Sequence, residues 1–205
     1  LARDFFGIKP VYYAEIDGHF VFASEIKSIL AFPGYERKVN QKALEQYLSF
    51  QYSPLEETFF KGIYKLMPGH MLLYKNGSYE IKTYFKPKLT PGQWNHKTNM
   101  AQLRSQLSEI LKDSVKHHML SDVEVGAFLS GGVDSGYLAS SSGADQAFTV
   151  GFDEGDRYSE VNKAAKVAEK AGLKHHVKII SKQEFWDALP DVMYHMDEPL
   201  GDASA

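Results

Sequence analysis

The sequence predicts an α/β protein with two parts, an antiparallel β-rich part followed by a parallel α/β part. Three observations support this fold class. Asp-Gly at 17–18 and Asn-Gly at 76–77 are hairpin signals that lie between apolar and aromatic runs. Beyond residue 97, strand-like apolar runs alternate with helical patterns. The first of these runs ends abruptly in Ser-Gly-Gly at 130–132, where the backbone can approach a ligand closely.

The chain opens with a predicted β-hairpin and a short helix. Strands are expected at Val11–Ile16 and His19–Ala23, because the Asp-Gly pair between them has the positive-φ preference of a type I′ turn. Ser24 is a candidate cap for a helix over Glu25–Ala31, and the Pro-Gly pair at 33–34 ends that helix.

A second helix and a second hairpin follow. Asn40 is the next cap candidate, and the apolar residues at 43, 44, 47 and 48 recur at helical spacing. Aromatic and β-branched residues fit strands at Met71–Tyr74 and Tyr79–Phe85. Lys86–Lys97 contains prolines and shows no periodicity, so it reads as a linker. We therefore assign residues 1–90 to one domain and 91–205 to another.

The second segment alternates helices and strands. Thr98 precedes a helix whose apolar positions, from Met100 to Val115, form one stripe. The next expected elements are strand Val123–Leu129, a helix from Ser135, strand Ala147–Phe152, helix Ser159–Ala171, strand His175–Ile180 and helix Lys182–Tyr194. This alternation predicts a parallel sheet covered on both faces. In such sheets ligands bind beyond the carboxyl ends of the strands.

The composition is that of a globular protein. The 205 residues are 43% hydrophobic and 24% charged, and the net charge of -3 gives no reason to expect nucleic acid or a membrane as partner. No apolar run approaches the roughly 20 residues that span a bilayer. The chain contains no cysteine, which excludes disulfides, Cys-ligated zinc and a thiol nucleophile for this polypeptide. A cytoplasmic location is the expectation.

The loop at 130–135, Ser-Gly-Gly-Val-Asp-Ser, has the features of an anion site. Paired glycines remove side chains that would block a ligand, and amides at the start of the following helix carry partial positive charge. The chain has no G-x-x-x-x-G-K-[ST] sequence, so this is not a P-loop. Asp134 beside phosphates requires a divalent cation between them, because carboxylate and phosphate repel each other. The competing interpretation is a tight strand-to-helix turn with Ser as N-cap and no ligand.

Several motifs in chain order resemble the bacterial-type glutamine-dependent asparagine synthetases. They are RDFFGIKP at 3–10, FASEIK at 22–27, KLMPGH at 65–70, SDV at 121–123, GAFLSGGVDS at 126–135, FTVGF at 148–152, DEP at 197–199 and DASA at 202–205. The loop at 130–135 is similar to the SGGxDS pyrophosphate motif of the ATP pyrophosphatases. The resemblance implies the C-terminal part of an N-terminal-nucleophile glutaminase domain in 1–90. It implies the first part of an ATP-pyrophosphatase domain, similar to the adenine nucleotide alpha hydrolases, in 91–205, so that both domains are expected to be incomplete.

The resemblance also implies a reaction. ATP adenylates the β-carboxylate of aspartate with release of pyrophosphate, and ammonia from glutamine then gives asparagine and AMP. Mg²⁺ and loop amides would offset the charge that builds on the departing pyrophosphate. The glutaminase nucleophile of the family is an N-terminal cysteine, so no catalytic residue of that reaction is expected here. We expect the piece itself to be inactive, and a homodimer is the assembly considered for the parent enzyme.

The site residues follow from the loop and the resemblance. Those assigned to ATP and its pyrophosphate are Leu129, Ser130, Gly131, Gly132, Asp134, Ser135, Val150 and Gly151. Asp134 would also bind Mg²⁺, Leu129 and Val150 would flank the adenosine, and Gly151 would let the backbone approach the base or ribose. Three acidic residues could position the substrate, although an exposed turn explains them equally well. They are Asp197, Glu198 and Asp202.

Two other functions remain open. A related amidotransferase or a β-lactam-synthetase-like enzyme would adenylate a different carboxylate with the same fold. A non-catalytic nucleotide-binding module would keep the fold without the chemistry, but the retention of Asp134 with both glycines argues against it.

Two further features are interpreted as structural. Gly136 stands where the resembled family commonly has a second Ser, at an early helical position where glycine costs roughly 0.5–1 kcal/mol. The His-His pairs at 117–118 and 175–176 are not expected to chelate a metal, because adjacent residues on a helix or strand point to different faces.

Overall fold

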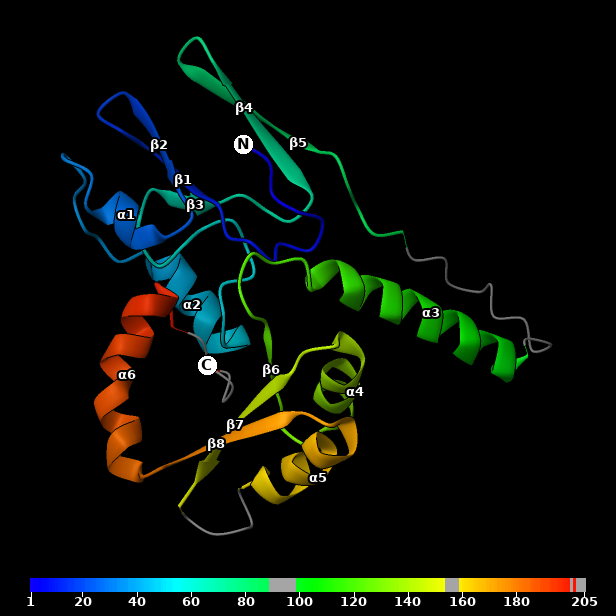
Figure 1. Cartoon of the computed structure of the whole chain (residues 1–205). Coiled ribbons are helices and arrows are strands. Elements are labelled where there is room, and N and C mark those ends of the chain that lie inside the picture. The colour runs from blue at the N-terminus through cyan, green and yellow to red at the C-terminus, as the bar shows by residue number, and fades with distance from the viewer. Residues whose placement is uncertain (89–98, 154–158, 200, 202–205) are drawn as a thin grey trace. The chain divides into compact units, whose positions relative to one another are not determined.

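The chain divides into two compact units. The computed structural model describes residues 1–88, 99–153, 159–199 and 201 (Figure 1). Unit 1 consists of Leu1–Thr90 together with Leu189–Ala205, and unit 2 consists of Pro91–Ala188. The second division therefore falls inside the last helix, α6 (Lys182–Met196), next to Pro190. None of the described helices is both long and apolar enough to cross a membrane.

Unit 1 contains two small antiparallel sheets. In one sheet, β1 (Tyr12–Ile16) lies between β2 (His19–Ala23) and β3 (Ile63–Lys65). In the other, β4 (His70–Lys75) pairs with β5 (Ser78–Thr83). Both predicted hairpins are confirmed, and Asp17 and Asn76 have the positive φ that their turns require. The short strand β3 is not predicted from the sequence, because three residues are too few to establish an alternating pattern.

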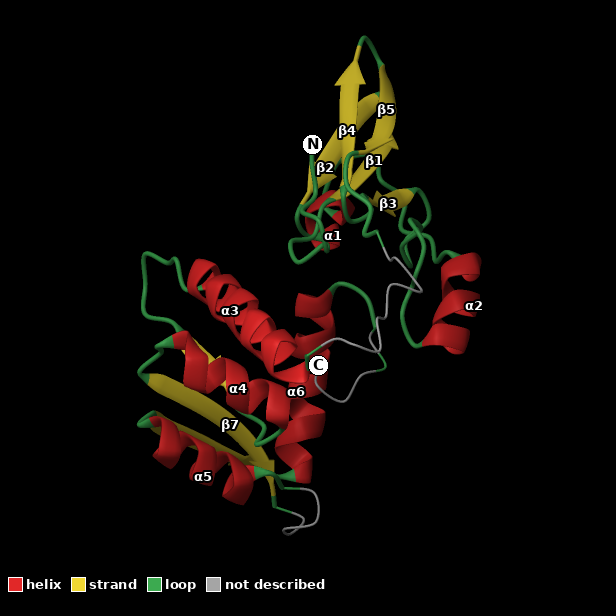
Figure 2. Cartoon of the chain, turned by 90° about the vertical axis from the view of Figure 1, so that its right-hand side faces the viewer, coloured by secondary structure: helices red, strands yellow, loops and turns green. Residues whose placement is uncertain are grey.

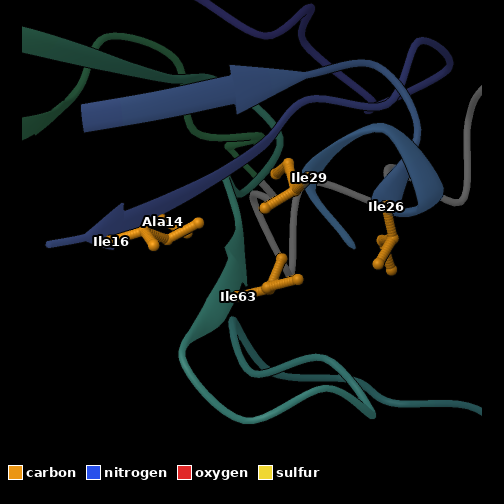
Figure 3. Packing of buried hydrophobic residues seen from close by; sticks show 5 residues of the cluster. All are labelled: Ala14, Ile16, Ile26, Ile29 and Ile63. Carbon is orange, nitrogen blue, oxygen red and sulfur yellow. The ribbon is translucent and has the colours of Figure 1, made fainter. Parts of the chain in front are cut away.

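Unit 1 also contains two short helices. α2 (Gln41–Phe50) begins after Asn40, whose side chain accepts a hydrogen bond from Lys42 N, so the predicted cap is confirmed. α1 (Ile26–Leu30) begins after Glu25, and the predicted Ser24 cap is wrong. The buried core joins α1 to the first sheet (Figure 3) through Ala14, Ile16, Ile26, Ile29 and Ile63.

Unit 2 contains a parallel three-stranded sheet. Its strands lie in the order β6 (Gly126–Phe128), β7 (Gln146–Phe152) and β8 (Lys174–Ile180), as the alternating pattern predicts. α4 (Val133–Ser142) connects β6 to β7, and α5 (Val161–Ala171) connects β7 to β8. The antiparallel part followed by the parallel part confirms the predicted fold class.

The helix α3 (Met100–His118) precedes the sheet. Its N-cap is Asn99, whose side chain accepts a hydrogen bond from Ala101 N. Thr98, which the sequence analysis places before this helix, lies outside the described residues. α4 starts at Val133 rather than Ser135, so the glycine-rich loop is shorter than the sequence suggests and the helix start lies within the motif.

α4 and α5 cover one face of the parallel sheet. Along β7, Ala147 and Thr149 are buried and point to the helices, whereas Phe148, Val150 and Phe152 on the other face are exposed. Figure 1 shows α4 and α5 next to each other on the same side of the strands, and in Figure 2, turned by 90°, β7 is seen between the two helices. The prediction of cover on both faces is therefore wrong for the described residues of unit 2. The strands follow one another in order across the sheet, and right-handed crossovers in one direction place both helices on the same side.

Gly136 provides a test of the packing between α4 and α5. A Cβ at this position would lie 3.5 Å from Val167 Cγ1, which is an ordinary contact. We predict that Gly136→Ala stabilises the protein by roughly 0.5–1 kcal/mol in urea unfolding, because alanine has the higher helix propensity. The matched control is Gly131→Ala, which we expect to destabilise, since Gly131 has φ +77° and its Cβ would lie 2.7 Å from Lys163 Cβ. Destabilisation of similar size in both variants would contradict this account.

Candidate functional site

The first glycine of the loop is required by packing. The loop leaves the sheet at Leu129, whose N–H donates to the Phe148 carbonyl at 2.9 Å. Gly131 then crosses the first turn of α5, where a Cβ would lie 2.7 Å from Lys163 Cβ and 2.9 Å from Ala164 N. Its φ of +77° is in the region that glycine adopts without strain. A side chain at this position is excluded by both the backbone conformation and the neighbouring helix.

The second glycine has a different role. Gly132 has φ -74°, and a Cβ on it would lie 3.3 Å from Ser130 Oγ and 3.9 Å from Ser135 Oγ. Neither the backbone nor the surrounding atoms strictly require glycine at this position. Gly132 is also the N-cap of α4, so it offers no side-chain acceptor to the first amides of that helix. Its missing side chain therefore leaves space beside two hydroxyl groups and the start of α4.

The two serines of the motif hold the loop together. Ser130 Oγ and Ser135 Oγ lie 2.9 Å apart, and Ser130 N donates to Ser135 Oγ at 3.3 Å. Gly132 N donates to Ser130 Oγ at 3.4 Å. These bonds connect the start of the loop to the first turn of α4. Asp134 is in the same turn, and its exposed carboxylate lies where the helix carries partial positive charge.

Two cavities meet at the loop. One has a volume of about 730 Å³, lies between α4 and α5, and is lined by Gly131, Gly132 and Lys170 among others. The other has a volume of about 470 Å³, lies between α3 and α4, and is lined by Arg104 and Asp134 among others. Val133 and Tyr137 line both cavities and separate them. The glycines and the carboxylate of the motif therefore open toward different sides of the start of α4.

The side chains of the two residues predicted to flank the adenosine, Leu129 and Val150, lie on opposite faces of the sheet. The Leu129 side chain is 2% exposed and packs with the alanines beneath α4 and α5. Val150 is 54% exposed and lies on the opposite face of the sheet. At Gly151 a Cβ would lie 2.6 Å from Val161 Cγ2 and 2.7 Å from Ile179 Cδ1, so this glycine is needed for the packing of neighbouring side chains.

The acidic residues near the C-terminal end make contacts within unit 1. Asp197 has φ +62°, and its side chain is 7% exposed. Its carboxylate accepts hydrogen bonds from Ile26 N at 2.7 Å and Lys27 N at 3.2 Å, and it pairs with Lys27 Nζ at 3.1 Å. The carboxylate thus caps α1, for which Glu25 provides no side-chain bond. Asp202 lies outside the described residues.

Glu198 makes a second contact of this kind. Its carboxylate accepts a hydrogen bond from Phe59 N at 2.7 Å. Burial raises the pKa of the Glu198 carboxyl above its usual value, although the Phe59 bond and the charge of Lys65 act against this change. Sequence reasoning missed both contacts because the partners are more than a hundred residues apart in the chain. A substrate-side role for this acidic pair stays a prediction.

The histidines of β8 have separate partners. His175 Nε2 lies 2.7 Å from Thr149 Oγ1, and His176 Nε2 lies 2.9 Å from Gln146 Oε1. The His176 ring also stacks on Phe148, with 4.9 Å between ring centroids. Over the described ranges, no three His, Cys, Asp or Glu side chains gather in a group that could bind a metal ion. Any cation at the loop would therefore depend on Asp134 together with oxygen atoms of a ligand.

Two protein families match the chain in succession. The glutamine amidotransferase domain family matches residues 1–85, and the asparagine synthase family matches residues 106–205. Asparagine synthetase [glutamine-hydrolyzing] 1 from Bacillus subtilis is 38% identical over 100% of this chain and 32% of its own length. A putative asparagine synthetase [glutamine-hydrolyzing] from Mycobacterium bovis is 35% identical over 98% of this chain and 32% of its own length. The chain therefore spans about a third of the length of these curated relatives.

Among solved structures, an NH3-dependent NAD synthetase from Campylobacter jejuni aligns with 46% of this chain and 42% of its own. The TM-score is 0.29 and the sequence identity is 20%.

We predict that Asp197→Ala lowers the free energy of unfolding by roughly 2–3 kcal/mol, because two amides of α1 and the Lys27 ammonium lose their partner. Asp197→Asn is the matched control. Asparagine also tolerates the left-handed backbone conformation and still accepts hydrogen bonds, so we expect a smaller loss. Urea unfolding measures both values. An equal loss in the two variants would show that the carboxylate does not act as a cap.

The raised pKa of Glu198 predicts a pH-dependent effect on stability. A carboxyl whose pKa is raised on folding stabilises the protein below its unfolded pKa, and this contribution is lost as pH rises through the folded pKa. We expect Glu198→Gln, which can still accept the Phe59 hydrogen bond, to raise the urea midpoint at about pH 7 more than at about pH 4. Glu80→Gln, at a side chain that is 61% exposed, is the control. A Glu198→Gln protein that is less stable than wild type at neutral pH would refute the burial argument.

Proposed function

Because this chain belongs to the glutamine-hydrolysing asparagine synthetase family, we propose that it supplies the pyrophosphate-binding loop of an ATP-dependent amide ligase. In the parent enzyme, ATP adenylates the β-carboxylate of aspartate and releases pyrophosphate. Ammonia from glutamine then attacks the acyl-adenylate to give asparagine and AMP. This chain contains no cysteine, so hydrolysis of glutamine would need a nucleophile from outside it.

The observation that supports this proposal best is the space at Gly132. A phosphate oxygen in that space would face the free amides at the start of α4 and the hydroxyl groups of Ser130 and Ser135. The helix dipole favours a negative charge at the same point. Gly131 serves the site indirectly, since it brings the loop against α5. The adjacent cavity of about 730 Å³ has room for a chain of phosphate groups.

Asp134 suits the binding of Mg²⁺ together with a nucleotide. Mg²⁺ prefers oxygen ligands and is commonly bound through one or two carboxylates plus substrate phosphates. Asp134 is an exposed carboxylate in the first turn of α4, two residues after Gly132, and it lines the cavity on the α3 side of that turn. When bound, the ion would lower the cost of negative charge on the leaving pyrophosphate. Without a cation, the carboxylate and the phosphates would repel each other.

The adenosine is best placed against the backbone at the carboxyl ends of β6 and β7. Open parallel sheets bind ligands at these ends. Leu129 would contribute backbone groups, because its side chain belongs to the core. Val150 and Gly151 lie in the last part of β7 and would contribute in the same way. Aspartate and ammonia as substrates, a cytoplasmic location and a homodimeric parent enzyme stay predictions.

Calorimetric titration of the full chain with Mg·ATP tests the proposal. We expect wild type to bind ATP. In the presence of Mg²⁺, Asp134→Asn should bind at least about tenfold more weakly than wild type, a loss of about 1.4 kcal/mol, whereas without Mg²⁺ the two should have similar affinities. Gly132→Ala should lose affinity with and without Mg²⁺, because the new methyl group occupies the proposed phosphate position.

One control separates binding from folding. Asp145→Asn changes an exposed acid beyond the other end of α4 and should bind like wild type. No detectable binding by wild type would argue against the site. Equal affinity of wild type and Asp134→Asn would remove the proposed role of the cation.

A further inference from the structure

One buried hydroxyl group connects two strands of the parallel sheet to the residue that follows the third. Thr149 of β7 is 5% exposed, and its Oγ1 lies 2.6 Å from the Leu129 carbonyl oxygen. The same Oγ1 lies 2.7 Å from Nε2 of His175 on β8. Leu129 is the residue between the end of β6 and the loop. The contact therefore lies where the chain leaves the sheet to form the candidate site.

The chemistry of the three groups sets the direction of the hydrogen bonds. A carbonyl oxygen only accepts, so the single hydroxyl proton of Thr149 points to Leu129. Thr149 Oγ1 must then accept from His175, which means that His175 Nε2 carries a proton. His175 thus holds the hydroxyl in the orientation that serves Leu129. The polar chain runs in one direction, from β8 through β7 to the end of β6.

This chain fixes one end of a peptide group whose other end is fixed by the loop. The Leu129 carbonyl and the Ser130 N–H belong to the same planar unit. Thr149 Oγ1 bonds to the carbonyl, and Ser135 Oγ accepts from the N–H at 3.3 Å. Rotation of this peptide would break both bonds. Because Ser135 is in the first turn of α4, the orientation of the peptide sets where the loop begins relative to that helix.

We propose that Thr149 and His175 are positioning residues for the loop at 130–135, which they orient through the Leu129 carbonyl without touching the nucleotide. This role adds to the proposed function of the loop, and its importance for catalysis rests on that proposed function. The neighbouring His176 provides the contrast, since it bonds to Gln146 at the start of β7 and stacks on Phe148 on the other face. The two histidines are adjacent in sequence, yet only His175 is connected to the loop.

Thr149→Val tests the role, because valine keeps the shape of the side chain and removes the hydroxyl. In the full chain, we expect the bonded amide of Ser130 to exchange its hydrogen at least about tenfold faster, while the amides of β8 keep their rates. Thr149→Ser should restore the wild-type exchange rate of that amide. His175→Leu should resemble Thr149→Val, and the matched control His176→Leu should leave the loop unchanged.

Titration with Mg·ATP is the second readout. We expect Thr149→Val and His175→Leu to bind at least about tenfold more weakly than wild type, with Thr149→Ser and His176→Leu close to wild type. The exchange experiment needs no ligand, so it decides the positioning role even if wild type fails to bind and the proposed function falls. Faster exchange throughout the sheet would overturn the inference, because it would indicate that the substitution destabilises the whole unit. Unchanged exchange in the loop would also overturn it, because Thr149 would then have no influence on the loop.

Discussion

Close packing of small side chains determines where every group of the candidate site lies. The core under α4 and α5 consists of Leu129 and four alanines, Ala139, Ala147, Ala164 and Ala168. Small residues let a helix approach a sheet closely, and here they bring the first turn of α5 against the loop. Gly131 follows from this approach, since no side chain fits between the loop and Lys163. The loop geometry is thus a consequence of the core and does not depend on the loop residues alone.

Unit 1 depends on a different interaction, a long-range contact of carboxylates. Asp197 caps α1 and pairs with Lys27, and Glu198 bonds to the backbone at Phe59. Taking carboxylates out of water is costly, so contacts of this kind select one arrangement of the chain more than they add stability. The segment after α6 therefore has a defined place on unit 1, and the hydrogen bonds that its two carboxyl groups accept from the backbone define that place.

The sequence predicts local structure well where the signal is local. Turn chemistry locates the hairpins at Asp17 and Asn76, and periodicity with a cap locates α2 after Asn40. Features that depend on distant residues could not be predicted. The cap of α1 comes from Asp197, which no pattern near α1 indicates, and the one-sided cover of the sheet depends on strand order. Within the motif, the residue types indicate a loop, but the burial of Leu129 and its bond from Thr149 depend on residues outside the motif.

The position of the cap helps to choose between the two interpretations of the loop. A ligand-free turn of the kind expected from sequence would have a serine as N-cap, with its hydroxyl bonded to the helix amides. Instead the N-cap of α4 is Gly132, and Ser130 Oγ lies against Gly132 N and Ser135 Oγ. The serines thus stabilise the loop itself and leave the start of the helix without a side-chain cap. A helix start of this kind gains most from an external anion, which is why Gly132, more than Gly131, supports the interpretation of the motif as a phosphate site.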